Sequence, residues 1–233
     1  MLLEVIATNL ADAIAADQGG ADRIELVTGM LEGGLTPSLG LIERAAGSVS
    51  IPVNVMVRPH SLSFHYDKHD VQTMLTDIRH IRKTGARGIV IGALTQEGRV
   101  DVGLLQGLLA EAGELDVTFH RAFDEAADLA EALETLSEFP QISRVLTSGG
   151  TAPAPQAVNR IQELNRLASK THLNILAGHG LTVDGIGAFV RETGVQEVHF
   201  GSAVREDGHA LKPIDPKRIA MIRTNLNLSP VKK

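Results

Sequence analysis

Short apolar runs alternate with amphipathic stretches along the whole chain. The runs are rich in Val and Ile and almost continuously apolar, which is typical of strands in a buried parallel sheet. The stretches between them carry apolar residues at helical spacing, so the pattern predicts repeated strand–helix units. The eight expected strands cover 2–6, 23–27, 51–57, 88–91, 116–119, 144–147, 173–177 and 197–200. The expected helices cover 9–18, 37–46, 69–83, 101–112, 125–138, 154–169, 183–193 and 215–226.

A weak internal repeat supports this reading. Segments that start at Gly20, Gly85 and Gly194 each have a glycine, a small apolar residue and then a strand. Eight units of roughly 29 residues, with no linker or change in composition, favour a closed (β/α)8 TIM barrel with eight parallel strands, formed by 1–233 as one domain. An open, doubly wound sheet is the alternative. Thr36-Pro37 and Pro216 offer start signals for two of the helices.

Polar residues alternate with apolar ones within the expected strands. If the apolar positions face the helices, the opposite positions point into the barrel. One inner layer would then hold Glu25, Val90, Leu146 and His199, and the remaining inward polar residues are Glu4, Asn54, Arg58, Thr118, His120 and Asn174. A purely structural barrel core is filled by Val, Ile and Leu. The alternatives are internal ion pairs, or an assignment of the two faces that is wrong by one residue.

The inward polar residues predict a site at the C-terminal mouth of the barrel, where this fold places its sites. In an enzyme, Glu25 or Glu4 would be the general base, His120 or His199 the general acid, and Arg58 the clamp for an anion. Arg58 should pair with a carboxylate when no ligand is bound, because a lone buried guanidinium is costly. His120 and His199 are also the candidate metal ligands.

Two sets of loops add candidates. Glycine-rich turns follow the last three expected strands and can present backbone N–H groups to an anion; otherwise they serve only as tight turns. Their candidate anion-binding residues are Ser148, Gly149, Gly178, Gly180, Gly201 and Ser202. The segment 59–70 contains three His and two Asp, with His65 and His69 at a helical ligand spacing. We expect an exposed polar loop there in preference to a metal site.

The amino-acid composition excludes several classes of partner and of binding site. The net charge of −6 argues against nucleic-acid and anionic-membrane partners, and the chain has no Cys, which excludes disulfides and Cys metal sites. We find no signal peptide and no transmembrane stretch, so we expect a cytoplasmic protein. Lys232-Lys233 is the only pair of consecutive lysines.

Several segments resemble the CutC family, named for copper homeostasis. The most specific are Gly-Gly-Leu-Thr-Pro-Ser at 33–38 and Thr-Phe-His-Arg-Ala-Phe-Asp at 118–124, and others lie at 3–5, 19–26, 58–59, 145–150 and 197–199. The resemblance implies a TIM barrel, a cytoplasmic location, copper as the associated ion and an oligomer, most simply a homodimer. The chain departs from the family after Arg58-Pro59, where His60 replaces the usual second Arg. Copper-binding members have Cys near the N-terminus and elsewhere, whereas here Ile6 and Ala7 stand near the end of the first expected strand.

Two main functions compete. The first is a cytosolic copper homeostasis protein that binds copper ion weakly through His, because the thiolates that hold Cu(I) best are missing. The second is an uncharacterised lyase- or isomerase-type enzyme that acts on a small phosphorylated or carboxylated metabolite. A structural dimer scaffold, the third possibility, does not explain the interior charges.

Overall fold

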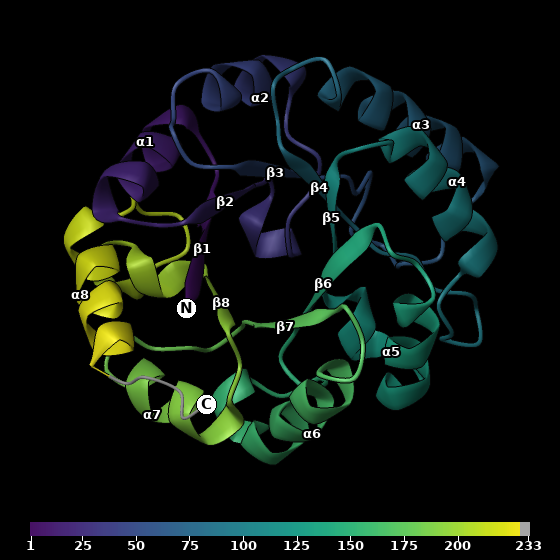
Figure 1. Cartoon of the computed structure of the whole chain (residues 1–233). Helices are drawn as coiled ribbons and strands as arrows, with labels where there is room; N and C mark the ends of the chain where they lie inside the picture. The colour runs from purple at the N-terminus through teal and green to yellow at the C-terminus, as the bar shows by residue number, and fades with distance from the viewer. Residues whose placement is uncertain (229–233) are drawn as a thin grey trace.

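The computed structural model describes residues 1–228 and forms a closed barrel of eight parallel strands, each hydrogen-bonded to the next and β8 to β1 (Figure 1). Closure confirms the predicted TIM barrel and removes the open-sheet alternative. Residues 229–233, with the Lys232-Lys233 pair, lie outside the described residues. The strands are β1 (Leu2–Ala7), β2 (Arg23–Leu26), β3 (Val53–Met56), β4 (Gly88–Ile91), β5 (Asp116–Phe119), β6 (Ile142–Thr147), β7 (Asn174–Ala177) and β8 (Glu197–Phe200).

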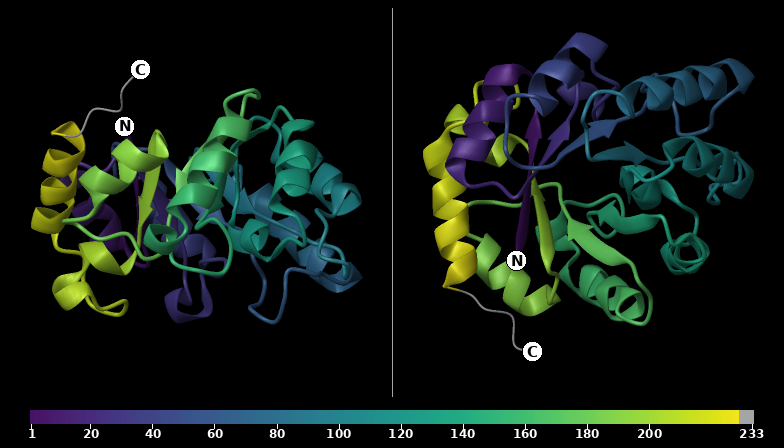
Figure 2. Two further views of the ribbon diagram at one scale, coloured as in Figure 1. Left: turned by 90° about the horizontal axis from the view of Figure 1, so that it is seen from below. Right: turned by 45° about the horizontal axis from the view of Figure 1, so that its top comes forward.

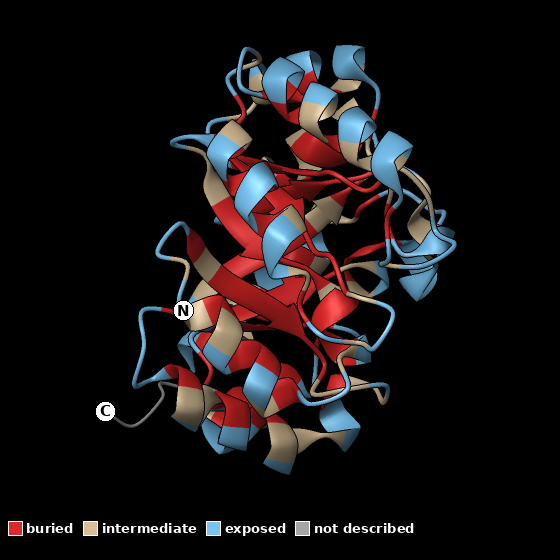
Figure 3. Ribbon diagram, turned by 90° about the vertical axis from the view of Figure 1, so that its right-hand side faces the viewer, coloured by how far each residue is buried: buried red, intermediate tan, exposed pale blue. Residues whose placement is uncertain are grey.

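One helix follows each strand and packs on the outside of the barrel (Figure 2). The strands and the inner faces of the helices are buried, whereas the outer helix faces are exposed (Figure 3). None of the helices within residues 1–228 has the length and apolar character needed to cross a bilayer. The helices are α1 (Leu10–Gly19), α2 (Leu39–Ala46), α3 (Lys68–Ile81), α4 (Val102–Ala112), α5 (Leu129–Ser137), α6 (Val158–Ala168), α7 (Ile186–Thr193) and α8 (Pro216–Asn227).

Several helix starts differ from the sequence prediction. Ser38, and not Thr36, caps α2 by accepting a hydrogen bond from the Leu41 N–H. The Thr36 hydroxyl instead accepts from the Arg58 N–H, 2.9 Å away, and so ties the loop after β2 to the end of β3. The Pro216 start is confirmed, with Asp215 as the cap. These differences arise because a hydroxyl near a helix start can also bind backbone from a neighbouring strand.

The alternation of faces along the strands is as expected. Val5, Ile24 and Val198 belong to the large apolar core between strands and helices, whereas Val27, Met56 and Val90 form a small separate cluster. Asn174 is the exception among the predicted interior residues. It begins β7 and is exposed, and its side chain donates to the Ser143 carbonyl. Asn174 therefore lies at the lower rim of the barrel, where its side chain reaches solvent.

Candidate functional site

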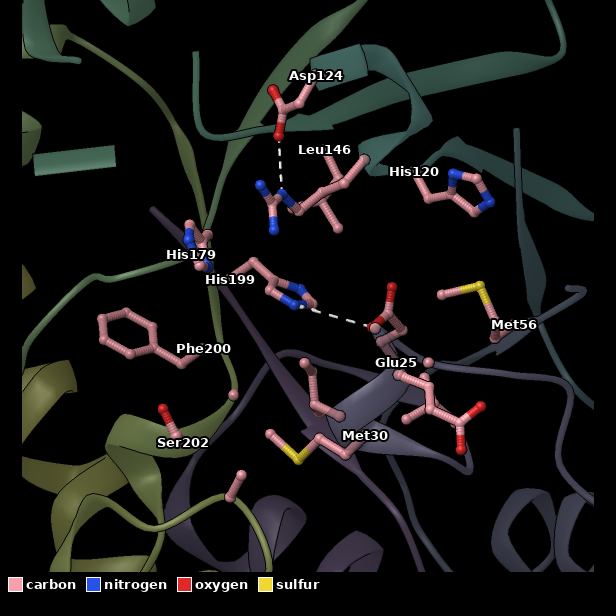
Figure 4. A pocket seen from close by; sticks show the side chains of 18 of the residues that line it. Glu25, Met30, Met56, His120, Asp124, Leu146, His179, His199, Phe200 and Ser202 are labelled. Carbon is pink, nitrogen blue, oxygen red and sulfur yellow. Dashed lines mark hydrogen bonds and ion pairs between the residues drawn. The ribbon is translucent and has the colours of Figure 1, made fainter. Parts of the chain in front are cut away.

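A cavity of about 580 Å³ opens at the C-terminal ends of the strands. We call it the mouth cavity. Its walls come from the ends of the strands and from the loops that follow them (Figure 4). Of the residues predicted from the sequence, those that line it are Glu25, Arg58, His120, His199, Gly180, Gly201 and Ser202. Glu4, Ser148, Gly149 and Gly178 are not among its lining residues.

Glu25 and His199 face each other in the mouth cavity (Figure 4). His199 Nε2 lies 3.8 Å from Glu25 Oε2, and Glu25 Oε1 is buried without a hydrogen-bond partner among the described residues. Burial raises the pKa of Glu25 to about 7, although His199 pulls it down. Burial lowers the pKa of His199, but the carboxylates of Glu25 and Glu4 outweigh that effect and raise it overall. Glu25 can therefore change protonation near neutral pH, whereas His199 keeps its proton to a higher pH than an ordinary histidine.

Glu4 lies beneath this pair and is already engaged. It is completely buried, accepts a hydrogen bond from the Arg23 Nε, and pairs with His199 Nδ1 at 2.8 Å. Burial raises its pKa, but Arg23 and His199 outweigh burial and lower it to about 2. A carboxylate this acidic, with both oxygens engaged, is a poor proton acceptor. Of the two carboxylates predicted as candidate bases, only Glu25 is free.

Glu4 also belongs to a buried ion network that the sequence analysis missed. Arg23 Nη2 donates to Glu197 at 2.8 Å, Arg144 Nε donates to the same carboxylate at 3.1 Å, and Arg144 also pairs with Asp116. These residues stand two positions before inward residues on the same strands: Arg23 before Glu25, and Glu197 before His199. If the alternation of inward and outward residues is followed two positions back from Glu25 and from His199, it identifies Arg23 and Glu197 as inward residues. Internal ion pairs therefore explain the buried charges near the strand starts. The inward groups that remain open lie closer to the mouth cavity.

His120 is held as a neutral ring. Its Nδ1 accepts a hydrogen bond from the Ala122 N–H at 3.1 Å, so the proton of the neutral ring sits on Nε2. Burial, together with the nearby charge of Arg58, lowers the pKa of His120 to about 3. This is a correction to the prediction of a general acid, because His120 carries no labile proton as an imidazolium at neutral pH. His120 can instead act as a hydrogen-bond donor.

Arg58 does not pair with a carboxylate among the described residues, so that prediction is wrong. Its Nη1 donates to the carbonyls of Glu32 and Gly34 at 2.9 and 3.2 Å, and its guanidinium lies 4.6 Å from the centre of the Phe64 ring. Gly33 and Gly34 have positive φ, and a Cβ at Gly33 would come within 3.0 Å of Arg58 Nη1. The glycine turn thus brings backbone carbonyls to the guanidinium without neutralising its charge. Its buried Nε has no hydrogen-bond partner among the described residues, although Arg58 does act on the buried Tyr66 hydroxyl: burial raises the pKa of Tyr66, and the charge of Arg58 opposes that rise.

The loop after β6 is not free for an anion. The Asp124 carboxylate accepts hydrogen bonds from the N–H groups of Ser148 and Gly150 at about 3 Å, and from the Thr147 hydroxyl. The Gly149 N–H donates to Thr147 Oγ1. Asp124 therefore occupies, from within the chain, the place predicted for a ligand at Ser148 and Gly149. The Gly178 N–H is also engaged, because it donates to the Thr147 carbonyl.

The His-rich segment 59–70 holds no metal-ligand cluster within the described residues. Asp67 and Asp70 form the capping box of α3, and His60 Nε2 lies 3.2 Å from Asp70. His65 and His69 are exposed. His65 and His69 thus lie on the exposed part of a segment that starts α3, whereas Tyr66 is buried and Phe64 lines the mouth cavity.

Glu4, Glu25 and His199 are the one group of described residues that brings three metal-ligand atoms within 4.8 Å of one another. His120 is not part of it. Since Glu4 is bound by Arg23 and by His199 Nδ1, only the Glu25 carboxylate and His199 Nε2 are open to an ion. Two open donors of this kind hold a cation weakly.

Comparisons with known proteins give the following matches. The sequence model of the CutC family matches residues 1–204. A CutC family protein of Photobacterium profundum is 40% identical over 210 residues, which cover 90% of this chain and 85% of that protein. One of Salmonella schwarzengrund is 41% identical over 203 residues, covering 87% of this chain and 80% of that protein.

Solved structures are similar as well. A Streptococcus agalactiae protein described as a copper homeostasis protein, CutC, has a TM-score of 0.80 and 29% identity, covering 85% of this chain and 97% of that chain. Phosphoribosyl anthranilate isomerase from Thermococcus kodakaraensis has a TM-score of 0.59 and 17% identity, covering 97% and 98%. The second likeness concerns the fold alone.

Proposed function

This chain belongs to the CutC family, and we propose that within it the protein is an acid–base enzyme, of the lyase or isomerase type, that acts on a small anionic metabolite in the mouth cavity. The observation that carries the proposal is the Glu25 carboxylate. It is 2% exposed, lines the cavity beside His199, and has one oxygen, Oε1, without a hydrogen-bond partner among residues 1–228. A buried carboxylate oxygen without a hydrogen bond costs folding free energy, and a task in the cavity accounts for that cost.

The pKa of Glu25 and the orientation of His199 suit proton transfer. A general base works best when its pKa lies near the working pH, and burial brings the pKa of Glu25 to about 7. His199 is anchored at Nδ1 by Glu4, which leaves Nε2 directed at Glu25 (Figure 4). Glu25 is thus the proposed base and His199 the proposed partner that shares or returns the proton.

Arg58 is the proposed anion clamp. Its charge is not neutralised by any carboxylate within residues 1–228, and its Nε is buried without a partner. A guanidinium binds carboxylate or phosphate with several N–H groups at once. Gly180, Gly201 and Ser202 line the same cavity and complete the proposed anion site.

The experiment is a thermal-shift screen of small carboxylates and phosphates. A ligand that binds only the folded state raises the melting temperature, and the stabilisation grows with the ratio of ligand concentration to Kd, as RT ln(1 + [L]/Kd). We expect Arg58→Ala to abolish this rise, while costing less unfolding free energy than a core Leu→Ala replacement, which costs ~2–5 kcal/mol. Arg99→Ala, on the exposed surface, is the matched control and should keep the response. A folded Arg58→Ala protein that is still stabilised by the same compounds would remove the clamp role.

A second candidate function is copper handling, as the description of the Streptococcus agalactiae relative suggests. The observation that favours it is the group of Glu4, Glu25 and His199 described above. The donors fit tight copper binding poorly, because Glu4 is engaged and the chain has no Cys. What they support is a weak site for copper ion, as cargo, at Glu25 and His199.

We expect copper affinity to be weak to moderate and to fall as the pH falls. An imidazole must lose its proton to bind metal, and the raised pKa of His199 lets protons compete at higher pH than for an ordinary His. Titration with Cu(I) in competition with a chromophoric chelator measures this. His199→Gln should remove binding, and the exposed His80→Gln should not. Subpicomolar affinity, or affinity unchanged in His199→Gln, would contradict it.

The remaining proposals depend on the family resemblance and on the sequence. They are a cytoplasmic location, a single domain over 1–233 and a homodimer. Light scattering on the purified protein would test the homodimer directly.

A further inference from the structure

We propose that the substrate is an enolisable carbonyl compound that carries a carboxylate or phosphate, and that His120 Nε2–H donates to its carbonyl oxygen. This inference rests on the proposed acid–base function, and it names the class of compound on which that function acts. It is built from three residues that line one cavity and that each have a buried polar atom without a hydrogen-bond partner among residues 1–228: Glu25 Oε1, Arg58 Nε and His120 Nε2.

The hydrogen bond from the Ala122 N–H fixes the character of His120. Because Nδ1 is the acceptor, Nε2 must carry the proton in the neutral ring. His120 is only 3% exposed, so neither bulk water nor a described residue satisfies this N–H. A buried donor without an acceptor costs free energy. An acceptor oxygen on a ligand would satisfy it, and a carbonyl is the simplest such group.

Arg58 and His120 share Phe64 as a neighbour. The Phe64 ring centre lies 4.6 Å from the Arg58 guanidinium carbon and 5.0 Å from the centre of the His120 ring. All three side chains line the mouth cavity, so one ligand can place its anionic group at Arg58 and its oxygen at His120. Such an arrangement suits a small compound in which carbonyl and anion are separated by few bonds. The guanidinium would also stabilise negative charge that develops on the oxygen.

The reaction that these groups support is enolisation. Glu25 removes a proton from the carbon next to the carbonyl: the C–H bond breaks, its electron pair forms a carbon–carbon double bond, and the carbonyl π pair moves onto the oxygen. The proton resides on Glu25 and can return to the same carbon or exchange with solvent. Glycoside hydrolysis by a carboxylate pair fits less well, because Glu4 and Asp124 are both engaged in internal contacts.

The test is hydrogen–deuterium exchange followed by proton NMR in D2O, with 2-oxobutyrate and dihydroxyacetone phosphate as probes. We expect the protein to accelerate loss of the proton signal next to the carbonyl in at least one of them. The probe that reacts shows whether Arg58 holds a carboxylate or a phosphate. His120→Phe should slow exchange about 10²–10³-fold, as loss of one donor to a developing oxyanion does elsewhere. His120→Gln, which restores an N–H donor, should recover part of the rate, and the exposed His80→Phe should exchange normally.

The outcomes separate the two proposals. Stabilisation by anions through Arg58 without any exchange of either probe would overturn the enolisation proposal and leave anion binding standing. Exchange that is unchanged in His120→Phe would remove the role of His120. If no small anion stabilises the protein and neither probe exchanges, both proposals fail.

Discussion

Replacing Arg23 by methionine is expected to lower the free energy of unfolding by about 3–5 kcal/mol. Arg23 is buried and is shared by Glu4 and Glu197, so its removal takes one of two ion-pair partners from each of these buried carboxylates and leaves His199 with Glu4 and Arg144 with Glu197. Methionine keeps most of the side-chain volume, which separates the loss of charge from the loss of packing. Urea denaturation at neutral pH measures the change.

The matched control is Arg79→Met, which breaks an exposed ion pair with Glu111 on α3 and α4. Exposed pairs contribute little, so we expect less than ~1 kcal/mol there. Arg23→Lys should lie between, because an ammonium cannot reproduce the forked contact with both carboxylates. Equal losses in Arg23→Met and Arg79→Met would mean that the network under the cavity does not hold the barrel together.

Glu25→Gln is expected to stabilise the protein at pH 8 by up to roughly 3 kcal/mol, and to do much less at pH 4. The unfolded carboxyl ionises near its usual pKa of 4.5, whereas the folded pKa of Glu25 is about 7. Between these values the folded state holds a proton that the unfolded state has lost, so wild-type stability falls as the pH rises through this range. Glutamine cannot ionise, and the variant avoids this loss.

The measurement is the free energy of unfolding of both proteins between pH 4 and pH 8. Glu43→Gln, at an exposed carboxyl on α2, is the control and should show no comparable gain at high pH. A Glu25→Gln difference that is the same at both pH values would show that Glu25 ionises in the folded protein as an ordinary carboxyl does. The proposed base would then lose its main electrostatic support. Stability gained by removing a functional group is the usual mark of an active site.

The sequence by itself determined the order of strands and helices and the face on which each strand residue lies. Both are local properties. A run of Val and Ile or a helical spacing can be recognised in a few residues, and the alternation of strand side chains has a fixed period. This is why Glu25, Arg58, His120 and His199 could be assigned to the interior before any distance was known. It is also why the helix starts, which depend on single capping contacts, were less accurate.

Only the tertiary structure decided which inward groups are free. Glu4 and Glu25 are the same chemical group at inward positions of neighbouring strands, but the register places Glu4 beside both Arg23 and His199. That pairing occupies Glu4 and leaves Glu25 open to the cavity. In the same way, Asp124 takes the backbone N–H groups of the loop after β6, and the Glu32 and Gly34 carbonyls meet Arg58. The sequence could not determine these partners, because each contact joins residues distant in the chain, and their distances are fixed only when the barrel closes.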